Sequence, residues 1–524
     1  MEKIQILDCT LRDGGYCNNW KFGKKNIEKI IMGLETANID IIEVGFLSQK
    51  KNATEDNSLY SLLSDMQVET DDNKQQQYVC MINYGEYHIE DIPEYRAGLI
   101  NGIRVAFHKQ DMAGAMDYCE KLIMKGYQVY VQPMVVLDYT DEELLKLIRS
   151  ADKIKPYAFY IVDSFGVMKK KELIHIYYMV EKHLSEDIWI GFHSHNNMQM
   201  SYANAQALID IKTNRKVIID TSIFGMGRGA GNLNTELFAQ YLNDNYDSSY
   251  NVDILISIFD ETLLPFYIQK NWGYSLANYL SAKYNCHPNY ATYLEDKNTL
   301  TASDINKIFG KLNKAKKNIF DKDYIEELYI QYMSADSQRK EEIGALKQLL
   351  NQTKVLIIAS GKTSIVEKEK ILKFIKENHC IVISINADYP FYDADYVFVS
   401  NIRRYQQIDK KLSAKMIVTS NILCDDAYMK ISYDKYLNEF ENVRDNAALM
   451  LINFLISENV KEIAVAGLDG YSANLNDNYY DCSMIIQSEE KILEKRNEGI
   501  IKFIRSLPEN IKVYSITEAR YISW

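Results

Sequence analysis

The chain has 524 residues, of which 47% are hydrophobic and 25% are charged, with only 7 Pro and 23 Gly. One hydrophobic core rarely grows to this size, so we expect a globular protein of at least two domains. The formal net charge of -12 disfavours a nucleic-acid partner, because binding to phosphates needs a basic surface. The eight Cys form no CxxC pair, which disfavours a zinc knuckle or a disulfide framework.

The N-terminus lacks an apolar signal region, and no run approaches the roughly 18 apolar residues that a membrane span needs. Scattered single Cys are typical of thiols that stay reduced inside the cell. We therefore expect a cytoplasmic protein with no membrane partner.

Short apolar runs alternate with helix-like stretches in the first part of the chain. The runs are rich in Ile, Val, Phe and Tyr, and the spacing leaves room for a helix between each pair. The strand candidates are 3–11, 39–46, 77–84, 102–108, 128–137, 158–166, 188–196 and 217–225. Eight such units predict a (β/α)8 TIM barrel over residues 1–250.

The pattern becomes helical over residues 251–350, where the Leu, Ile and Tyr spacing fits amphipathic helices. A polar, charged stretch at 337–347 predicts a helix end or linker. A second α/β pattern follows, with strand candidates at 353–364, 380–386, 396–401, 414–421, 462–470 and 512–517. We therefore predict a helical extension followed by a doubly wound, Rossmann-like α/β domain over residues 351–524.

Two histidines end the seventh predicted strand in the segment GFHSHNN. Residues i and i+2 of a strand point to the same side, so His193 and His195 face one volume. Two imidazoles with a carboxylate make a divalent-metal site with open positions. The alternative is two unrelated histidines on the barrel rim, and a third ligand decides between these interpretations.

The first predicted strand ends in an Arg–Asp pair that offers this ligand. The carboxylate of Asp13 can bind a metal, while the guanidinium of Arg12 can stabilise an enolate or oxyanion. A surface ion pair is the alternative. Gly14 and Gly15 follow directly and favour the functional interpretation, because they let the backbone approach a ligand closely.

A glycine-rich loop follows the eighth predicted strand. Residues 225–231 hold four glycines, and Asn232 can add a neutral oxygen ligand. Phosphate binding is the competing explanation for such a loop.

Three motifs in this order carry a family resemblance: LRDG at 11–14, HSHN at 193–196 and GRGAGN at 227–232. Together they resemble the DRE-TIM metallolyases, the family of 3-hydroxy-3-methylglutaryl-CoA lyase, over roughly residues 3–300. The similarity is greatest to the 4-hydroxy-2-oxovalerate aldolase branch, through the short barrel and the helices after it.

The resemblance implies a site for a divalent metal, with Mn²⁺ or Mg²⁺ expected over Zn²⁺ and no organic cofactor. The residues that match the family's metal ligands are Asp13, His193, His195 and Asn232. Arg12 matches the arginine that holds the enolate oxygen of a 2-oxo acid. Asp163 matches a position that lines the pocket beside the metal, and Glu43 is a weaker match of the same kind.

The general base is where the sequence departs from the aldolase branch. That branch carries a histidine at the place of Tyr16, and an ordinary phenol is a poor base at neutral pH. The branch also uses a tyrosine from its helical extension, and the segment WGYSLANY makes Tyr274 the candidate. His287 and His108 are further candidates, each with a purely structural role as the alternative.

The C-terminal domain carries weaker motifs. The segment IIASGKTS is a strand, a glycine turn and a helix start, a plausible phosphate cradle that does not match a P-loop. The segment AVAGLDGY is similar to a motif of sialyltransferase-like or pterin-pyrophosphokinase-like domains. A nucleotide or nucleotide-sugar ligand is one interpretation, and a structural strand and turn is the other.

The sequence therefore predicts a metal-dependent aldolase or lyase that makes or breaks a carbon–carbon bond beside a 2-oxo acid, with an aldehyde as partner. An acyl-CoA-dependent Claisen-type synthase is one alternative. A second alternative is a nucleotide or nucleotide-sugar binding or transfer protein that works through the C-terminal domain, with the barrel as partner. A third is transfer of the aldehyde from the barrel to the fused domain. A homodimer is the default expectation for this family.

Overall fold

The computed structural model describes residues 4–50, 53–66, 76–96, 100–211, 215–334, 350, 353–424, 427–485, 488 and 490–524. The chain divides into two compact units. The first contains residues 1–292 and 312–320, and the second contains residues 293–311 and 321–524. The predicted division at 250 and 350 stays a prediction, and the linker expected at 337–347 lies outside the described residues.

Within the described part of the first unit, eight parallel strands close into a barrel because β1 pairs with both β9 and β2. The strands are β1 (Ile4–Asp8), β2 (Ile41–Leu47), β4 (Gln77–Asn83), β5 (Gly102–Phe107), β6 (Gln128–Pro133), β7 (Ala158–Asp163), β8 (Trp189–Ser194) and β9 (Val217–Thr221). Each lies inside or within one residue of its predicted run. The predicted TIM barrel is confirmed.

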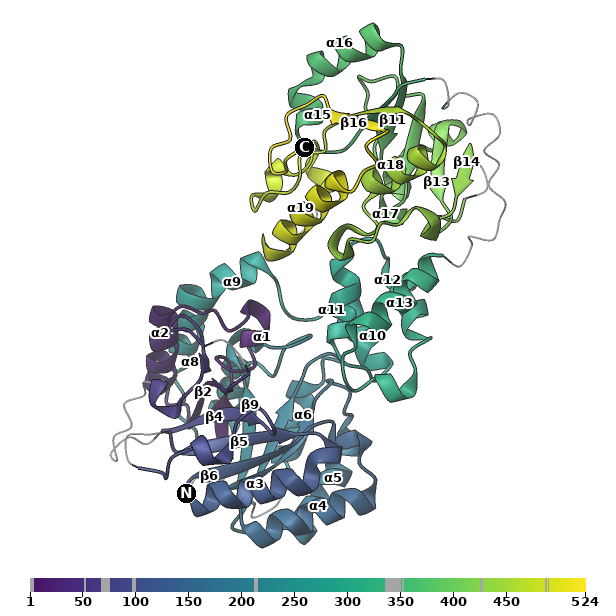
Figure 1. The fold of residues 1–524 in the computed structure, drawn as a ribbon. Coiled ribbons are helices and arrows are strands. Elements are labelled where there is room, and N and C mark those ends of the chain that lie inside the picture. The colour runs from purple at the N-terminus through teal and green to yellow at the C-terminus, as the bar shows by residue number, and fades with distance from the viewer. Residues whose placement is uncertain are drawn as a thin grey trace. The chain divides into compact units, whose positions relative to one another are not determined.

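Helices pack around the barrel and bury one apolar face each. They are α2 (Lys24–Thr36), α3 (Met112–Met124), α4 (Asp141–Ile154), α5 (Lys170–His183), α6 (Ser201–Ile209) and α7 (Thr235–Asn245). Figure 1 shows α3, α4 and α5 along the outside of the strands. The described residues between β2 and β4 form the short strand β3 (Leu59–Tyr60) and a 3-10 turn, and those between β4 and β5 form another such turn.

The barrel interior is filled by large side chains rather than left open. Tyr130 and Tyr160 are completely buried there beside Leu7, Val79 and Ile218. A second, larger apolar cluster lies between the strands and the surrounding helices. Because both faces of each strand are covered, the strands are near-continuous apolar runs.

The helices after the barrel fall in both units. The elements are α8 (Val252–Ile258), a π-helical turn (Phe259–Leu263), α9 (Leu264–Gln269), α10 (Leu276–Lys283), α11 (Asn289–Asp296), α12 (Ala302–Phe309) and α13 (Lys322–Met333). Helices α8 to α10 belong to the first unit, and α12 and α13 belong to the second.

The second unit is built on a parallel sheet in the order β14-β13-β12-β11-β10-β15-β16. The strands are β10 (Val355–Ile358), β11 (Ile381–Ile385), β12 (Tyr396–Val399), β13 (Met416–Thr419), β14 (Met429–Ile431), β15 (Glu462–Ala466) and β16 (Lys512–Ser515). The principal helices are α16 (Lys368–Asn378), α17 (Ile402–Gln407), α18 (Ala447–Ser457) and α19 (Glu490–Arg505). The predicted doubly wound sheet is confirmed, while the three-residue strand β14 is an addition.

None of the helices in the described part of the chain has the length and apolar character needed to cross a lipid bilayer.

Candidate active site

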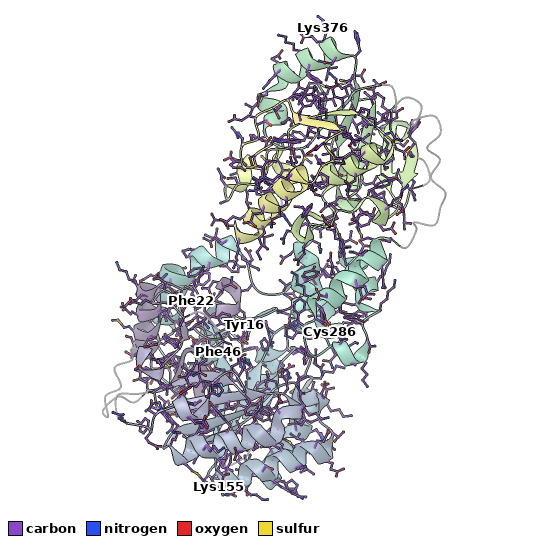
Figure 2. All side chains as sticks on the ribbon, in the orientation of Figure 1. Tyr16, Phe22, Phe46, Lys155, Cys286 and Lys376 are labelled. Carbon is purple, nitrogen blue, oxygen red and sulfur yellow. The ribbon has the colours of Figure 1, made fainter. Side chains whose placement is uncertain are left out.

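The predicted site residues gather at the carboxyl end of the barrel strands. Figure 2 shows Tyr16, just after β1, near one end of the barrel and Lys155, just before β7, at the opposite end. One oxygen of Asp13 and one nitrogen each of His193 and His195 lie within 4.8 Å of one another, and all three residues are buried. Three potential metal-ligand atoms, carried by the ends of two strands that are distant in the sequence, therefore converge on one point.

Both imidazoles are held so that Nε2 faces the site. Nδ1 of His193 lies 2.8 Å from the carboxylate of Asp220, and Nδ1 of His195 lies 3.1 Å from the backbone carbonyl of Asp163. Each Nδ1 must therefore carry the proton, which leaves the Nε2 lone pair free. Burial lowers the pKa of His193 to about 4, although Asp220 acts against this shift, so the ring is neutral at pH 7.

Two buried atoms of this group lack a hydrogen-bond partner among the described residues. They are Nε2 of His195 and Oδ1 of Asn232. Nε2 of His195 lies 3.4 Å from Oδ2 of Asp13. Asn232 donates from Nδ2 to the same oxygen at 2.8 Å, and it pairs with His195 through a backbone bridge. An imidazole nitrogen, an amide oxygen and a carboxylate are suitable ligands for a divalent cation, so these residues fit a metal.

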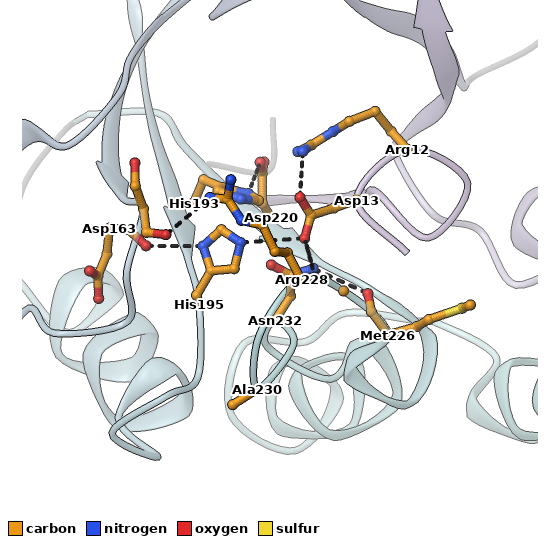
Figure 3. Close-up of polar contacts among 12 residues, drawn as sticks. Arg12, Asp13, Asp163, His193, His195, Asp220, Met226, Arg228, Ala230 and Asn232 are labelled. Atoms are coloured by element: carbon orange, nitrogen blue, oxygen red, sulfur yellow. Dashed lines mark hydrogen bonds and ion pairs between the residues drawn. The ribbon is translucent and has the colours of Figure 1, made fainter. Parts of the chain in front are cut away.

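Asp13 stays ionised in this buried position. Burial by itself would raise the pKa of Asp13, but the charge of Arg12 and the two imidazoles lower it well below its ordinary value. Nη1 of Arg12 donates to Oδ1 of Asp13 at 2.6 Å. Figure 3 shows Asp13 between Arg12 on one side and His195 on the other, with Asn232 close by. The carboxylate can therefore share its oxygens between the guanidinium and a cation.

A chain of buried charges supports these residues from inside the barrel. Glu43 accepts from Nε of Arg12 at 2.9 Å and from Nη1 of Arg104 at 2.7 Å. Nη2 of Arg104 donates to Asp220, which holds His193. The sequence did not assign a role to Arg104 or Asp220. The signal for Arg104 was a charged residue inside an apolar barrel strand, which must find partners in the interior.

Asp163 lies beside the cluster but turns its side chain away from it. Its carboxylate accepts from the backbone N–H groups of Val167 and Met168, at 2.9 and 3.1 Å. Burial raises the pKa of Asp163 to about 6, although these hydrogen bonds lower it. The contact of Asp163 with the site is made by its backbone carbonyl, which orients His195.

The candidate bases differ in how the structure places them. The ring of Tyr16 lies under the guanidinium of Arg228, at 5.5 Å. Although Tyr16 is 37% exposed, desolvation of its phenol raises the pKa of this group. Tyr274 is 55% exposed before α10, and among the described contacts none joins it to the cluster. Burial, with the charge of Arg228, lowers the pKa of His287 to about 2, and its Nδ1 accepts from the backbone of Asn289. Burial also lowers the pKa of His108.

Gly227 brings backbone against the cluster where no side chain fits. A Cβ at this position would lie 2.2 Å from Nδ2 of Asn232 and 2.6 Å from Oδ2 of Asp13. We expect Gly227→Ala to lower the affinity for Mn²⁺ about 10- to 100-fold, the usual effect of disturbing the surroundings of metal ligands. Mn²⁺ titration followed by electron paramagnetic resonance measures this, with thermal unfolding as the control for folding. An unchanged affinity would contradict the placement of Asn232 and Asp13.

The barrel sequence is similar to sequences of known proteins. Residues 104–259 match the family model described as HMGL-like. The chain is 25% identical over 260 residues to 4-hydroxy-2-oxovalerate aldolase 6 from Rhodococcus jostii, an alignment that covers 49% of this chain and 72% of the relative. Residues 104–259 are therefore an HMGL-like domain, and the predicted resemblance of the barrel to the DRE-TIM family is confirmed. The chain is a carbon–carbon lyase, as the DRE-TIM motifs implied.

Other similar proteins are named for different reactions. Over 238 residues this chain is 23% identical to oxaloacetate decarboxylase from Mycobacterium tuberculosis, an alignment that covers 44% of this chain and 67% of that one. A crystal structure of the N-terminal domain of a proposed aldolase from Bacteroides vulgatus is 30% identical, with a TM-score of 0.49. That match covers 58% of this chain and 99% of the solved one. HMGL-like enzymes depend on a divalent metal, and Asp13, His193 and His195 form a group that can hold one.

Proposed function

We propose that the barrel is a divalent-metal-dependent aldolase or lyase that makes or breaks a carbon–carbon bond beside a 2-oxo acid. The observation that carries this proposal is the convergence of Asp13, His193 and His195, with free imidazole nitrogens, next to the guanidinium of Arg12. Asn232 is the proposed fourth ligand. The relatives named 4-hydroxy-2-oxovalerate aldolase and oxaloacetate decarboxylase support a 2-oxo acid as the substrate class.

A bound divalent cation supplies Lewis-acid polarisation of the 2-oxo acid and stabilises negative charge on its oxygens. Mn²⁺ or Mg²⁺ suits the mixture of oxygen and imidazole ligands.

Arg12 is the proposed donor to the enolate oxygen. Its Nε and Nη1 are fixed by Glu43 and Asp13, whereas Nη2 has no partner among the described residues. A guanidinium held on two sides is preorganised, so its remaining donors can stabilise charge that develops in the reaction. Burial by itself would lower the pKa of Arg12, but the charges of Glu43 and Asp13 hold it well above its ordinary value, so this group is a fixed cation.

Tyr16 is the proposed orienting residue rather than the base. A phenol with a raised pKa is a hydrogen-bond donor at neutral pH, and Arg228 holds its ring in place. Tyr274 and Asp163 stay predictions for proton transfer.

Deuterium exchange into the methyl group of pyruvate tests this proposal, because it needs enolate formation but no aldehyde. The protein is stripped of metal, Mn²⁺ or Mg²⁺ is added back, and exchange is followed by NMR. We expect metal-dependent exchange that falls about 100-fold or more in Arg12→Ala, since one oxyanion donor contributes about 10²–10³ in rate. The Mn²⁺ affinity of this variant separates loss of the donor from loss of the site.

The alternative outcomes discriminate between the rival functions. Metal binding without pyruvate exchange would favour an acyl-CoA donor or another non-pyruvate substrate. Failure to bind a divalent metal would overturn the proposal for the barrel. The aldehyde partner, a homodimer and a cytoplasmic location remain predictions.

A further inference from the structure

A cavity of about 380 Å³ lies in the second unit, and it shares no lining residue with the barrel site. It is lined by residues that follow β10, β11, β12 and β15, together with the start of α18 and one face of α19. Its volume falls in the range of small-molecule pockets, which is roughly 300–1,000 Å³. The residues used in the argument below are Ser360, Asn386, Arg404, Asn446, Tyr471 and Arg496.

The sheet topology places this cavity where doubly wound folds bind ligands. From β10 the chain builds the sheet outward through β11 to β14, and it then returns to the other side of β10 through β15. The order reverses between β10 and β15, and the crevice outside the carboxyl ends of strands at such a reversal is a binding position. Gly361 and Gly467 follow these two strands, and a Cβ on Gly361 would lie 2.3 Å from the carbonyl oxygen of Gly467. The same Cβ would lie 2.8 Å from Oδ2 of Asp469, so these two turns pack backbone against a carboxylate at this point of the crevice.

Arg404 brings a cation into the cavity that no described carboxylate neutralises. It is 8% exposed, and its Nη1 and Nη2 donate to Gln407 and to the backbone carbonyls of Ser483 and Met484. Its Nε–H has no partner among the described residues. Burial lowers the pKa of Arg404, and no carboxylate is among the charges that act on it. A buried guanidinium with a free donor is a site for an anion.

A second positive element faces the same cavity. Helix α18 follows Asn446, and the first residues of the helix line the cavity. The side chain of Asn446 caps the helix by accepting from the N–H groups of Ala448 and Leu449. The N-terminus of an 11-residue helix carries partial positive charge and favours anions.

The remaining lining carries both signs of charge. Its lysines are Lys297, Lys322 and Lys495, and its carboxylates are Asp296, Glu441, Asp445 and Asp469. Three of these carboxylates already have partners, because Glu441 pairs with Lys322, Asp445 accepts from Tyr329 and Asp469 accepts from Thr363.

The guanidinium of Arg496 lies over the ring of Tyr471, at 5.7 Å, and among its described contacts there are only a hydroxyl and a backbone carbonyl, without a carboxylate. Ser360 and Asn386 add a hydroxyl and an amide, which suit the hydroxyl groups of a ligand.

We propose that this cavity binds a phosphorylated, hydroxyl-bearing metabolite, with the phosphate held by Arg404, Arg496 and the N-terminus of α18. Two guanidinium groups and a helix N-terminus match the double negative charge of a phosphate better than the single charge of a carboxylate. The sugar or ribose of the metabolite contacts the amide and hydroxyl groups. The site is independent of the metal cluster in the barrel.

Calorimetric titration of the full chain tests this proposal with pyrophosphate, glucose 1-phosphate and UDP as probes. Uridine, glucose and citrate are the matched compounds without phosphate. We expect saturable binding of at least one phosphate probe, weakened about 10- to 100-fold in Arg404→Gln. Asn446→Asp is expected to weaken the same binding, because it keeps the helix cap but places a negative charge beside the phosphate. The preferred probe distinguishes a nucleotide from a sugar phosphate.

Two controls separate this site from the rest of the protein. Arg505→Gln changes an exposed arginine at the end of α19 and should leave the affinity unchanged. Asp13→Asn should also leave it unchanged, which makes a failure here distinguishable from a failure of the barrel proposal. The proposal is overturned if no phosphate probe binds the folded chain. It is equally overturned if uridine, glucose or citrate binds as well as the phosphates, or if both Arg404→Gln and Asn446→Asp keep wild-type affinity.

Discussion

Asp13→Asn is expected to lower the affinity for Mn²⁺ at least about 100-fold and to abolish metal-dependent deuterium exchange into pyruvate. Asp13 contributes the carboxylate of the metal-ligating group, and its oxygens contact Arg12, His195 and Asn232. An amide removes the negative charge while keeping the size of the side chain. The loss should exceed the roughly 10- to 100-fold effect typical of residues that only orient a ligand. Electron paramagnetic resonance of Mn²⁺ and NMR of pyruvate measure the two effects.

The matched control is Asp117→Asn, which neutralises an exposed carboxylate on α3 that pairs with Lys121. It should leave metal affinity and exchange unchanged. Metal affinity of Asp13→Asn within about threefold of the unmodified chain would show that the cation is held elsewhere, since a lost ligand costs more than a lost orienting group.

Arg104→Met is expected to destabilise the barrel by about 3–5 kcal/mol, the usual cost of leaving buried charges without their partner. Arg104 is completely buried, bridges Glu43 and Asp220, and lies 4.9 Å from the centre of the Tyr160 ring. With the amide oxygen of Gln132 turned toward it, the guanidinium gains two further acceptor contacts, at 3.0 and 3.2 Å. Urea unfolding followed by circular dichroism measures the loss.

The loss should be larger at pH 8 than at pH 5. Burial already raises the pKa of Glu43, and the charge of Arg104 opposes that rise. Without Arg104 the folded-state pKa of Glu43 rises further above its unfolded value, so the folded state prefers the protonated acid. The free energy of unfolding of the variant therefore falls as the pH rises from the unfolded-state pKa of Glu43 to its higher folded-state pKa. Arg149→Met, on the exposed face of α4, is the control, and a loss below about 1 kcal/mol for Arg104→Met would contradict the role of the buried network.

The two α/β patterns and the residues that could bind a metal were predictable from the amino-acid sequence. Strand runs buried on both faces are apolar without interruption, so their positions are visible without tertiary information. The polar residues that end these runs had to lie at one rim, because parallel strands of a barrel share their carboxyl end. Asp13, His193 and His195 could therefore be grouped from their places at the strand ends alone, and the fold brings these three together.

The groups that support and surround that cluster could be identified only in the folded chain. Arg104 pairs with Glu43, which lies 61 positions away in the sequence, and with Asp220, which lies 116 positions away. No local sequence pattern encodes these pairings. The orientation of the candidate bases could not be predicted either. A tyrosine or histidine in a loop belongs to no regular helix or strand pattern that would indicate where its side chain points. The cavity of the second unit arises where the strand order reverses, which depends on how the sheet is assembled. The periodicity of apolar residues in the sequence indicates which side chains are buried. The pairing of residues distant in the sequence is a property of the folded chain.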